Sequence, residues 1–396
     1  LTNMKRRSFL ASVGTAGVIG LAGCSDSGSS DGGDGSGGDG SSGSDGSSGS
    51  DGSSGGDGGD GGSTDGGSSG TDTVTAAFVY DGRVGDQGWI YSHDRARQII
   101  DEENDWLETT YQEEVSPEES ERVMSDFVDA GADIVFTTSV VFADATLTAA
   151  ENNPDAYFEN ANGFNTRENL ARYGARVYEG RYPIGVAAGM LTETNTLGFI
   201  GGFPVPLTFR DLNAFTLGAK SVNPDITVQP TFTNEWYAPQ SATTTVNDFA
   251  NQDIDTVVAN LDSTATVSAA NDNDMWGSGI YSSMREAGGD TYISSPIASW
   301  EALYGSRCEA VRDGTWESQA VWQGVEEGLI TLDDFGPNIP DDVVDAAMEA
   351  RDGIVNGDVN IWEGSKFEGQ STDVGGPIET EMTTYVEGVQ GTAPEN

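Results

Sequence analysis

From residue 73 onward, short apolar runs alternate with segments of helical spacing, and this alternation constrains the fold most strongly. Strands are expected at 74–80, 108–113, 134–138, 157–160, 197–200, 226–232, 256–259, 292–297 and 319–324. Helices are expected at 90–103, 117–130, 178–191, 210–222, 239–251, 264–270 and 300–313. Such alternation predicts α/β architecture, with parallel sheets covered by helices on both faces. Because roughly 300 residues exceed one comfortable hydrophobic core, we expect two lobes.

The first 24 residues have the layout of an export signal. The motif KRRSFL at 5–10 resembles a twin-arginine signal, and the apolar run at 9–22 is too short to span a bilayer of about 30 Å. The run ends in LAGC at 21–24, which resembles a lipobox. We therefore expect residues 1–23 to be a cleaved twin-arginine signal peptide and Cys24 to carry a lipid anchor. The alternative is an uncleaved hydrophobic N-terminus with a free thiol.

Residues 24–72 form a second region, which after Cys24 contains almost only Gly, Ser and Asp. Such a segment has no apolar side chains whose burial could offset its ordering entropy. We expect a flexible tether spanning roughly 35–42 Å. An adhesive low-complexity role is the alternative.

The charge balance is strongly acidic, with 18 Lys+Arg against 65 Asp+Glu and a formal charge of −47. At about 1 M salt the Debye length falls to roughly 3 Å, which screens repulsion between surface carboxylates. The composition therefore indicates a halophile, an archaeon in our interpretation. A hydrophobic content of 36% and eight Trp favour a packed core over an acidic disordered chain. The negative field excludes nucleic acid and anionic membrane surfaces as partners.

Nothing in the sequence indicates an enzyme. The segment DGRVGDQG at 81–88 lacks both G-x-G-x-x-G and G-x-x-x-x-G-K-[ST] spacing, so no nucleotide cofactor is predicted. No Gly-x-Ser-x-Gly motif or metal-type cluster occurs, and His93 is the single histidine. We therefore predict no catalytic residue and no metal, and we expect His93 to be structural. Cys24 and Cys308 offer no disulfide framework.

Candidate ligand contacts follow the expected strands, because ligands of open α/β sheets lie beyond the carboxyl ends of the strands. The residues at these positions are Asp86, Trp89, Ser139, Phe142, Phe203, Trp236, Asp262 and Trp300. Five aromatic rings at five strand ends favour a planar ligand, and Asp262 would accept hydrogen bonds from it. The alternatives stay open: Trp89 as a core residue, and Asp86 and Asp262 as helix N-caps.

Several segments resemble the basic membrane protein family of ABC-transporter solute-binding lipoproteins, whose best-known type is a purine nucleoside receptor. They are VGDQGWIYSHD at 84–94, YEGRYPIGVAAG at 178–189, NAFTLGA at 213–219, SVNP at 221–224, NEWY at 234–237, DGTW at 313–316 and FGP at 335–337. The chain departs from this pattern at GIYSSM, 279–284, and at VVF, 140–142.

The resemblance implies a type I periplasmic-binding fold, in which a three-segment hinge joins two parallel-sheet lobes. It further implies that Trp89 and Phe203 stack on a purine base or nucleoside, that Asp262 bonds its polar edge, and that Trp236 and Trp300 line the cleft. An ABC permease and its ATPase subunits would receive the ligand. The lipid anchor would be the only membrane attachment and would hold the protein outside the cell.

The predicted organisation is a two-lobed domain at 73–370 followed by a flexible acidic tail at 371–396. Lobe 1 covers about 73–190 and lobe 2 about 191–295, and each takes part of the C-terminal region. We expect a monomer that binds its ligand without chemistry. The alternatives are a trap for a sugar or amino acid, an exported hydrolase, and a sensory ligand-binding protein.

Overall fold

The computed structural model describes residues 73–85 and 87–394. The predicted signal peptide at 1–23, the Cys24 anchor, the tether and Asp86 lie outside the described residues. Within the described ranges, no helix is both long enough and apolar enough to cross a bilayer.

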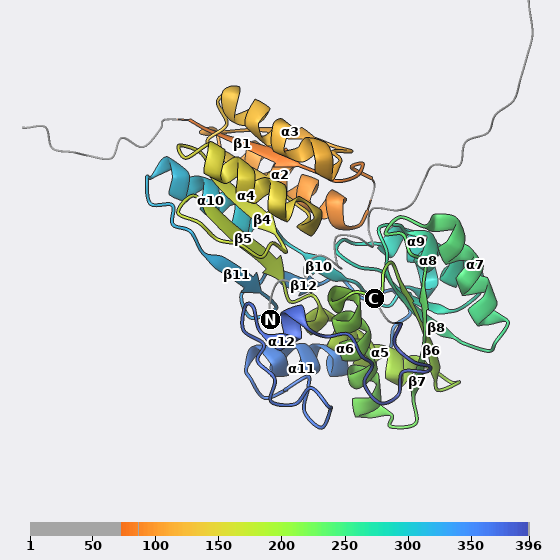
Figure 1. Ribbon diagram of the computed structural model, residues 1–396. Coiled ribbons are helices and arrows are strands. Elements are labelled where there is room, and N and C mark those ends of the chain that lie inside the picture. Colours follow the sequence, from red (N-terminus) through yellow and green to blue (C-terminus); the bar gives the residue numbers. More distant parts are fainter. Residues whose placement is uncertain (1–72, 86, 395–396) are drawn as a thin grey trace, which may run out of the picture. The chain divides into compact units, whose positions relative to one another are not determined.

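Lobe 1 is built on a six-stranded parallel sheet in the order β11-β5-β4-β3-β1-β2 (Figure 1). Its strands are β1 (Val74–Val79), β2 (Leu107–Gln112), β3 (Ile134–Thr137), β4 (Tyr157–Ala161), β5 (Leu170–Ala175) and β11 (Ala320–Gln323). One face carries α2 (Trp89–Glu103) and α10 (Glu301–Arg312), and the other carries α3 (Pro117–Asp129) and α4 (Ala143–Asn152). Alternate residues of β1 enter the two cores, which is the period-2 pattern of a strand buried on both faces.

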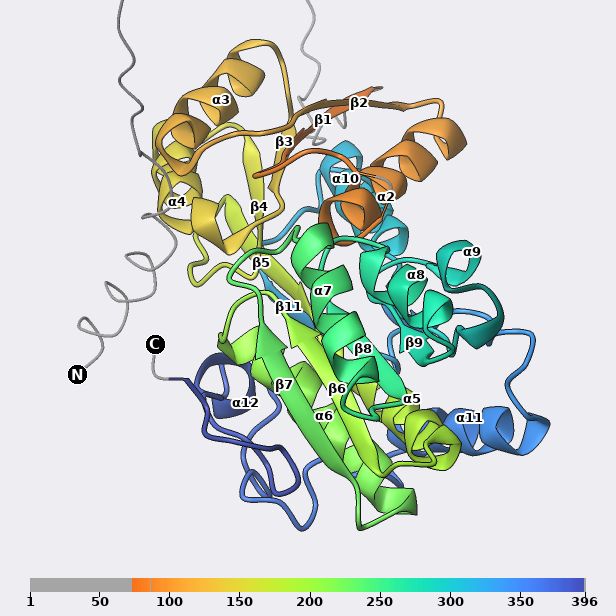
Figure 2. The same ribbon diagram turned by 90° about the vertical axis from the view of Figure 1, so that its right-hand side faces the viewer.

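Lobe 2 is built on a four-stranded parallel sheet in the order β7-β6-β8-β9 (Figure 2). Its strands are β6 (Thr196–Gly201), β7 (Thr227–Phe232), β8 (Thr256–Asn260) and β9 (Trp276–Ser278). The first face packs on α5 (Tyr178–Leu191) and α6 (Pro206–Val222), and α11 (Asp341–Val355) packs against α5. The second face packs on α7 (Pro239–Ala250) and α8 (Ala265–Asp272). The short α9 (Arg285–Gly288) and η2 (Gly289–Thr291) follow β9.

Two glycines allow α5 and α6 to approach closely. A Cβ on Gly185 would lie 2.1 Å from the Phe215 carbonyl oxygen, and one on Gly218 would lie 2.0 Å from that of Tyr182. Neither position has room for a side chain. The expected lobe boundary near 190 is therefore corrected, because α5 packs within lobe 2.

Three segments cross between the lobes, as the expected type I periplasmic-binding fold requires. The chain passes from β5 to α5, from β10 (Pro296–Ala298) to α10, and from β11 to β12 (Ile330–Leu332). Strands β10 and β12 pair antiparallel and form a small separate sheet. The expected fold class, two parallel-sheet lobes with a three-segment hinge, is confirmed.

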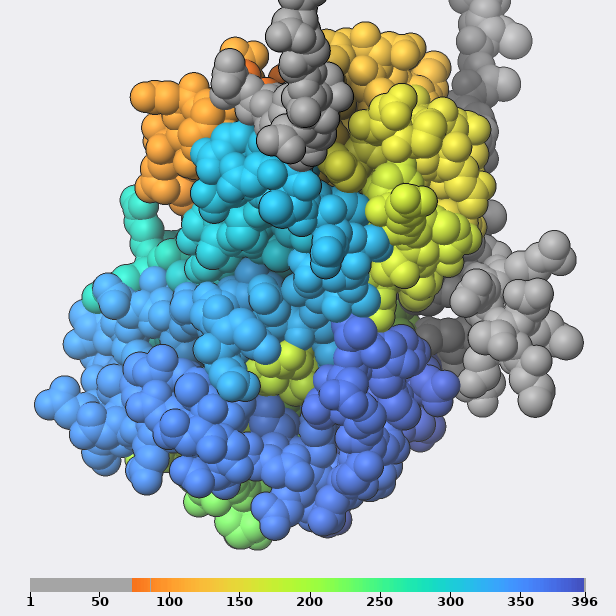
Figure 3. Space-filling view, turned by 90° about the vertical axis from the view of Figure 1, so that its left-hand side faces the viewer, coloured from red at the N-terminus to blue at the C-terminus, as the bar shows by residue number. Residues whose placement is uncertain are grey.

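The C-terminal segment 371–394, which we call the strap, is not the flexible acidic tail that the sequence suggested. Ile378, Met382 and Val386 are buried, four residues apart, in an apolar cluster shared with Trp322 of β11. Acidic residues between these apolar positions hide the helical spacing from inspection of the sequence. Beyond α12 (Pro377–Thr380), the strap pairs with the edge of β7, where the Val228 N–H donates to the Gly388 carbonyl over 2.9 Å. Figure 3 shows the strap in dark blue beneath the yellow-green part of lobe 1.

Local assignments differ in several places. The strand expected at 292–297 is confined to Pro296–Ala298 and follows a short 3-10 turn. Sequence inspection missed strands β5, β9 and β12, helices α4 and α11, and the short helices α9 and α12. Strand β5 contains Arg and Gly, which weaken a strand pattern, while its neighbours β4 and β11 supply the pairing.

Candidate ligand-binding site

A carboxylate of lobe 2 caps a helix of lobe 1. Trp89 is the first residue of α2, and its backbone N–H donates to Asp262 Oδ1 over 2.7 Å. The N-cap of α2, Gly88, contributes no side-chain bond of its own. A helix N-terminus has unpaired N–H groups and a positive partial charge, so a carboxylate is a favourable partner. Asp262 thus does cap a helix, but not the following one, α8, whose N-cap is Thr264.

Backbone geometry makes this contact dependent on glycine. Gly88 has φ +98°, and a Cβ there would lie 2.6 Å from the Asp262 Cα. The Gly88 N–H donates to Ser282 Oγ over 3.2 Å, and this hydroxyl in turn donates to Gln87 Oε1 over 2.5 Å. The loop before α2 therefore meets lobe 2 through several hydrogen bonds.

Two carboxylates interact at this junction. Desolvation raises the pKa of Asp262 to about 7, the Trp89 N–H lowers it, and the charge of Asp81 raises it. Asp81 lies after β1, and part of its surface is exposed to water. Nearby protein groups still desolvate its carboxyl group and raise its pKa, and a hydrogen bond with Ser139 lowers the pKa in part. The oxygens of these carboxyl groups favour ligands rich in N–H or O–H donors, and in their ionised form the two groups repel phosphates.

Trp89 combines core packing with partial exposure. Its indole N–H donates to the Thr138 carbonyl over 2.7 Å. Its ring contacts those of His93, Tyr281 and Trp300 edge to face, at centroid distances of 4.4, 5.1 and 5.4 Å. The residue is nevertheless only half-buried. The Trp89 ring therefore packs against the core and keeps part of its surface accessible, and its contact with a ligand stays a prediction.

Phe203 and Trp236 lie together on lobe 2. Their ring centroids are 5.2 Å apart at an interplanar angle of 64°, and both side chains are half-buried. The Asp262 N–H donates to the Trp236 carbonyl over 2.8 Å. A Cβ on Gly202 would lie 2.3 Å from the Trp236 ring, so glycine admits that ring. A chain of contacts thus links four predicted site residues: Trp89, Asp262, Trp236 and Phe203.

Two predicted contacts are corrected to core positions. Phe142 and Trp300 are both 0% exposed. Phe142 packs between the sheet and helices α3 and α4 of lobe 1. Trp300 stacks on His93 at 4.5 Å and donates from Nε1 to Ser92 Oγ over 3.1 Å. Trp300 therefore supports Trp89 from behind instead of lining a surface. Ser139, 9% exposed, lies beside Asp81.

His93 is a core residue. Its Nδ1 lies 2.5 Å from the Tyr304 hydroxyl, and burial lowers its pKa, so the ring is neutral. Among the described residues, no group of three or more His, Cys, Asp or Glu could hold a metal ion.

Sequence reasoning missed Asp81 and Tyr281. Asp81 lies two residues beyond the end of β1, so the strand-end rule should have included it. Tyr281 lies in the segment 279–284 that departs from the family pattern. It has φ +67° and presents its ring to Trp89. No propensity argument places a tyrosine at positive φ, which is why this position escaped notice.

The family of ABC transporter substrate-binding proteins described as PnrA-like matches residues 73–363. The chain belongs to this family.

Two relatives are similar over most of the chain. A Haloferax volcanii protein named as an ABC transporter glucose-binding protein is 42% identical over 333 residues, covering 84% of each chain. A purine-binding protein of Brucella abortus is 35% identical, covering 83% of this chain and 97% of its own.

Solved structures agree on the fold. An ABC transporter solute-binding protein from Conexibacter woesei superposes with a TM-score of 0.63 at 20% identity, covering 73% of this chain and 98% of its own. A transcriptional activator of the comK gene from Bacillus halodurans gives 0.65 at 21% identity, covering 72% and 99%. At these identities the likeness speaks for the fold alone.

Proposed function

We propose that this ABC-transporter solute-binding protein holds a purine base or nucleoside between its lobes and hands it to a permease driven by ATPase subunits. The carrying observation is the Trp89–Asp262 contact, which joins aromatic rings and a carboxylate from separate lobes at one junction. Each ring that stacks on a planar ligand would contribute about 0.5–1.5 kcal/mol beyond burial. The protein acts as a monomeric trap, without covalent chemistry.

The mechanism is hinged closure. The ligand enters while the lobes are apart and lies against Trp89 of lobe 1. Phe203 and Trp236 of lobe 2 then close over it. A ligand shifts the open–closed equilibrium only by the contacts that it makes better in the closed form. Asp81 and Asp262 accept its N–H or O–H donors.

Glucose is a second candidate, favoured by the name of the 42% identical relative. A pair of carboxylates beside a tryptophan would also suit a sugar ring. Calorimetric titration with adenine, adenosine, guanosine, hypoxanthine and glucose separates the two ligands. Binding of a purine at micromolar or lower Kd supports the proposal, whereas glucose binding without any purine response refutes it.

Variants locate the binding surface. Trp89→Ala should weaken purine binding at least tenfold, because it deletes the stacking face. Trp106→Ala is the matched control, because Trp106 is likewise half-buried but packs under Arg312 at the start of β2. Equal affinities of the two variants would remove Trp89 from the site.

ABC solute-binding proteins work outside the cytoplasm, and we propose that this one is exported through the signal at 1–23 and anchored by lipid on Cys24. Residues 24–72 would then keep the trap near its permease by raising the effective concentration. Cys24→Ser should move the protein from the membrane fraction to the medium. Retention of this variant in the membrane would contradict the anchor.

A further inference from the structure

A cluster of buried polar side chains lies on lobe 2 next to the proposed site. Arg181 of α5, Asp211 of α6 and Asn260 of β8 are each at most 1% exposed. Asn260 Nδ2 donates to Asp211 Oδ2 over 2.7 Å. Arg181 donates to the carbonyl oxygens of Gly279, over 2.9 Å, and Ala259. The guanidinium therefore rests on the carboxyl ends of β8 and β9, where an α/β sheet binds its ligands.

Four atoms of this cluster have no hydrogen-bond partner among the described residues. They are Arg181 Nε, Asp211 Oδ1, Asn260 Oδ1 and Thr208 Oγ1. Buried polar atoms are nearly always paired, so a set of four on three adjoining elements indicates a missing occupant. The occupant must accept from Nε–H and donate to two oxygens. Two neighbouring hydroxyls do this, because each donates one hydrogen bond and can accept another, whereas a phosphate or an ionised carboxylate has no proton to donate.

Tyr281 connects the cluster to the ligand junction. Its ring packs edge to face on Trp89 at 5.1 Å, and its phenol interacts electrostatically with both Asp211 and Asp262. Asn260 is the last residue of β8, and Asp262 follows two residues later. A ligand that stacks on Trp89 and reaches past Tyr281 would arrive at the unpaired atoms.

We propose that Arg181, Asp211 and Asn260 form a hydroxyl-binding subsite that takes the vicinal hydroxyls of a sugar ring. This inference rests on the proposed function and narrows it, because it selects a nucleoside over a free base. The same chemistry could come from the ribose of a nucleoside or from a free hexose, and the titrations below distinguish them. An ordered water is the competing occupant, since buried waters commonly bridge such groups.

The experiment measures the affinity of each of four ligands for each of three proteins. Adenosine, 2′,3′-dideoxyadenosine, adenine and glucose are titrated by calorimetry into the unaltered chain, into Asn260→Ala and into the control Asn251→Ala, whose residue is exposed at the end of α7. We expect the unaltered chain and the control to bind adenosine at least tenfold more tightly than dideoxyadenosine. In Asn260→Ala this advantage should fall below threefold, while the adenine Kd stays unchanged.

The outcomes separate the two proposals. Equal binding of adenosine and dideoxyadenosine, or an equal loss for every ligand in Asn260→Ala, means that the cluster holds only water and overturns the subsite. Glucose binding that is sensitive to Asn260→Ala, without purine binding, retains the subsite and refutes the purine proposal. If Asn260→Ala does not fold, Thr208→Val replaces it, because valine matches threonine in shape. At least a threefold loss confined to adenosine is then expected, and unchanged adenosine binding overturns the subsite.

Discussion

Replacing Gly88 by alanine tests the junction of the lobes most directly. The new methyl group would lie 2.6 Å from the Cα and Oδ1 of Asp262, so the lobes could not close to the distance seen here. Closure would then lose the hydrogen bond from the Trp89 N–H to Asp262. Because the obstruction involves backbone, no side-chain rotation relieves it.

The magnitude has two parts that can be separated. A hydrogen bond to a charged group contributes about 1.5–3 kcal/mol, and each 1.4 kcal/mol is about tenfold in affinity. Ligand affinity should therefore fall about 10- to 100-fold. Gly88 also has φ 98° and ψ −159°, a region that is essentially restricted to glycine and costs other residues about 1–3 kcal/mol. This strain is present with the lobes open or closed, so it lowers the melting temperature without changing affinity.

Gly85→Ala is the matched control in the same loop. A Cβ on Gly85 would meet only the Gln87 carbonyl oxygen at 3.9 Å, and its φ is not positive. Calorimetry gives the affinity, and thermal melts of the ligand-free proteins give the strain. If Gly88→Ala lowers the melting temperature but binds ligand as tightly as Gly85→Ala, then the contact between Trp89 and Asp262 does not exist in the bound protein.

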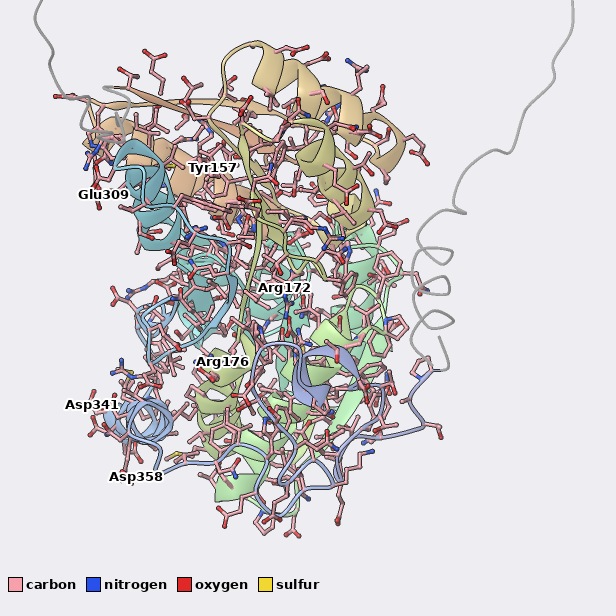
Figure 4. The ribbon with its side chains drawn as sticks, turned by 60° about the vertical axis from the view of Figure 1, so that its left-hand side comes forward. Tyr157, Arg172, Arg176, Glu309, Asp341 and Asp358 are labelled. Atoms are coloured by element: carbon pink, nitrogen blue, oxygen red, sulfur yellow. The ribbon has the colours of Figure 1, made fainter. Side chains whose placement is uncertain are left out.

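Three further predictions concern charge. The pKa of Asp262 is raised to about 7 from an ordinary value of about 4, so the stability that its protonated form contributes is complete below pH 4 and lost as the pH rises through 7. The melting temperatures of the unaltered chain and Asp262→Asn should therefore converge at low pH, and a constant difference between them from pH 4.5 to 8 would argue against the raised pKa. Glu379 of the strap accepts a hydrogen bond from Arg172 of β5 over 2.8 Å, and each of the two side chains is 12% exposed (Figure 4 labels Arg172). Glu379→Gln should therefore lower the free energy of unfolding, measured in urea, by about 1–3 kcal/mol, whereas Glu381→Gln, at an exposed position, should leave it unchanged. Dilution from molar to 0.1 M salt lengthens the Debye length from about 3 to about 10 Å, so the melting temperature should fall, and a salt-independent value would contradict the halophile interpretation.

The parts of the fold that follow from repeating patterns were predictable from the sequence. Strand β1 buries alternate residues on both faces, and its apolar run is unmistakable. The type I fold followed from the number of such units together with the family resemblance. Helix α11 was missed because its apolar positions are interrupted by six charged residues in DDVVDAAMEARDGIV, and only packing against α5 identifies its buried face. The strap was missed for the same reason.

The site was predictable only in outline. Strand ends located Trp89, Phe203, Trp236 and Asp262, because parallel strands place their carboxyl ends on one edge. The same rule included Trp300, whose position after β10 belongs to the hinge and points the ring into the lobe 1 core. A strand end specifies where a residue lies along the sheet, but not which side of the backbone its ring occupies. That choice depends on partners such as His93, which are distant in sequence.

In the proposed trap, the capping of α2 by Asp262 lets the lobes close and still release the ligand. When the lobes part, water replaces the carboxylate at the helix N-terminus, so this capping bond contributes about 1.5–3 kcal/mol to closure, beside the hydrogen bonds of Gly88 and Gln87 with Ser282. A bias of this size keeps the open form accessible, and the ligand must supply the remaining preference through contacts that exist only in the closed form. In the proposed site, the aromatic rings would contact any flat or ring-shaped solute with little discrimination. In the proposed subsite, selection among solutes would fall to the buried polar atoms of lobe 2, where a ligand that lacks the hydroxyls would leave Asp211 and Asn260 unpaired.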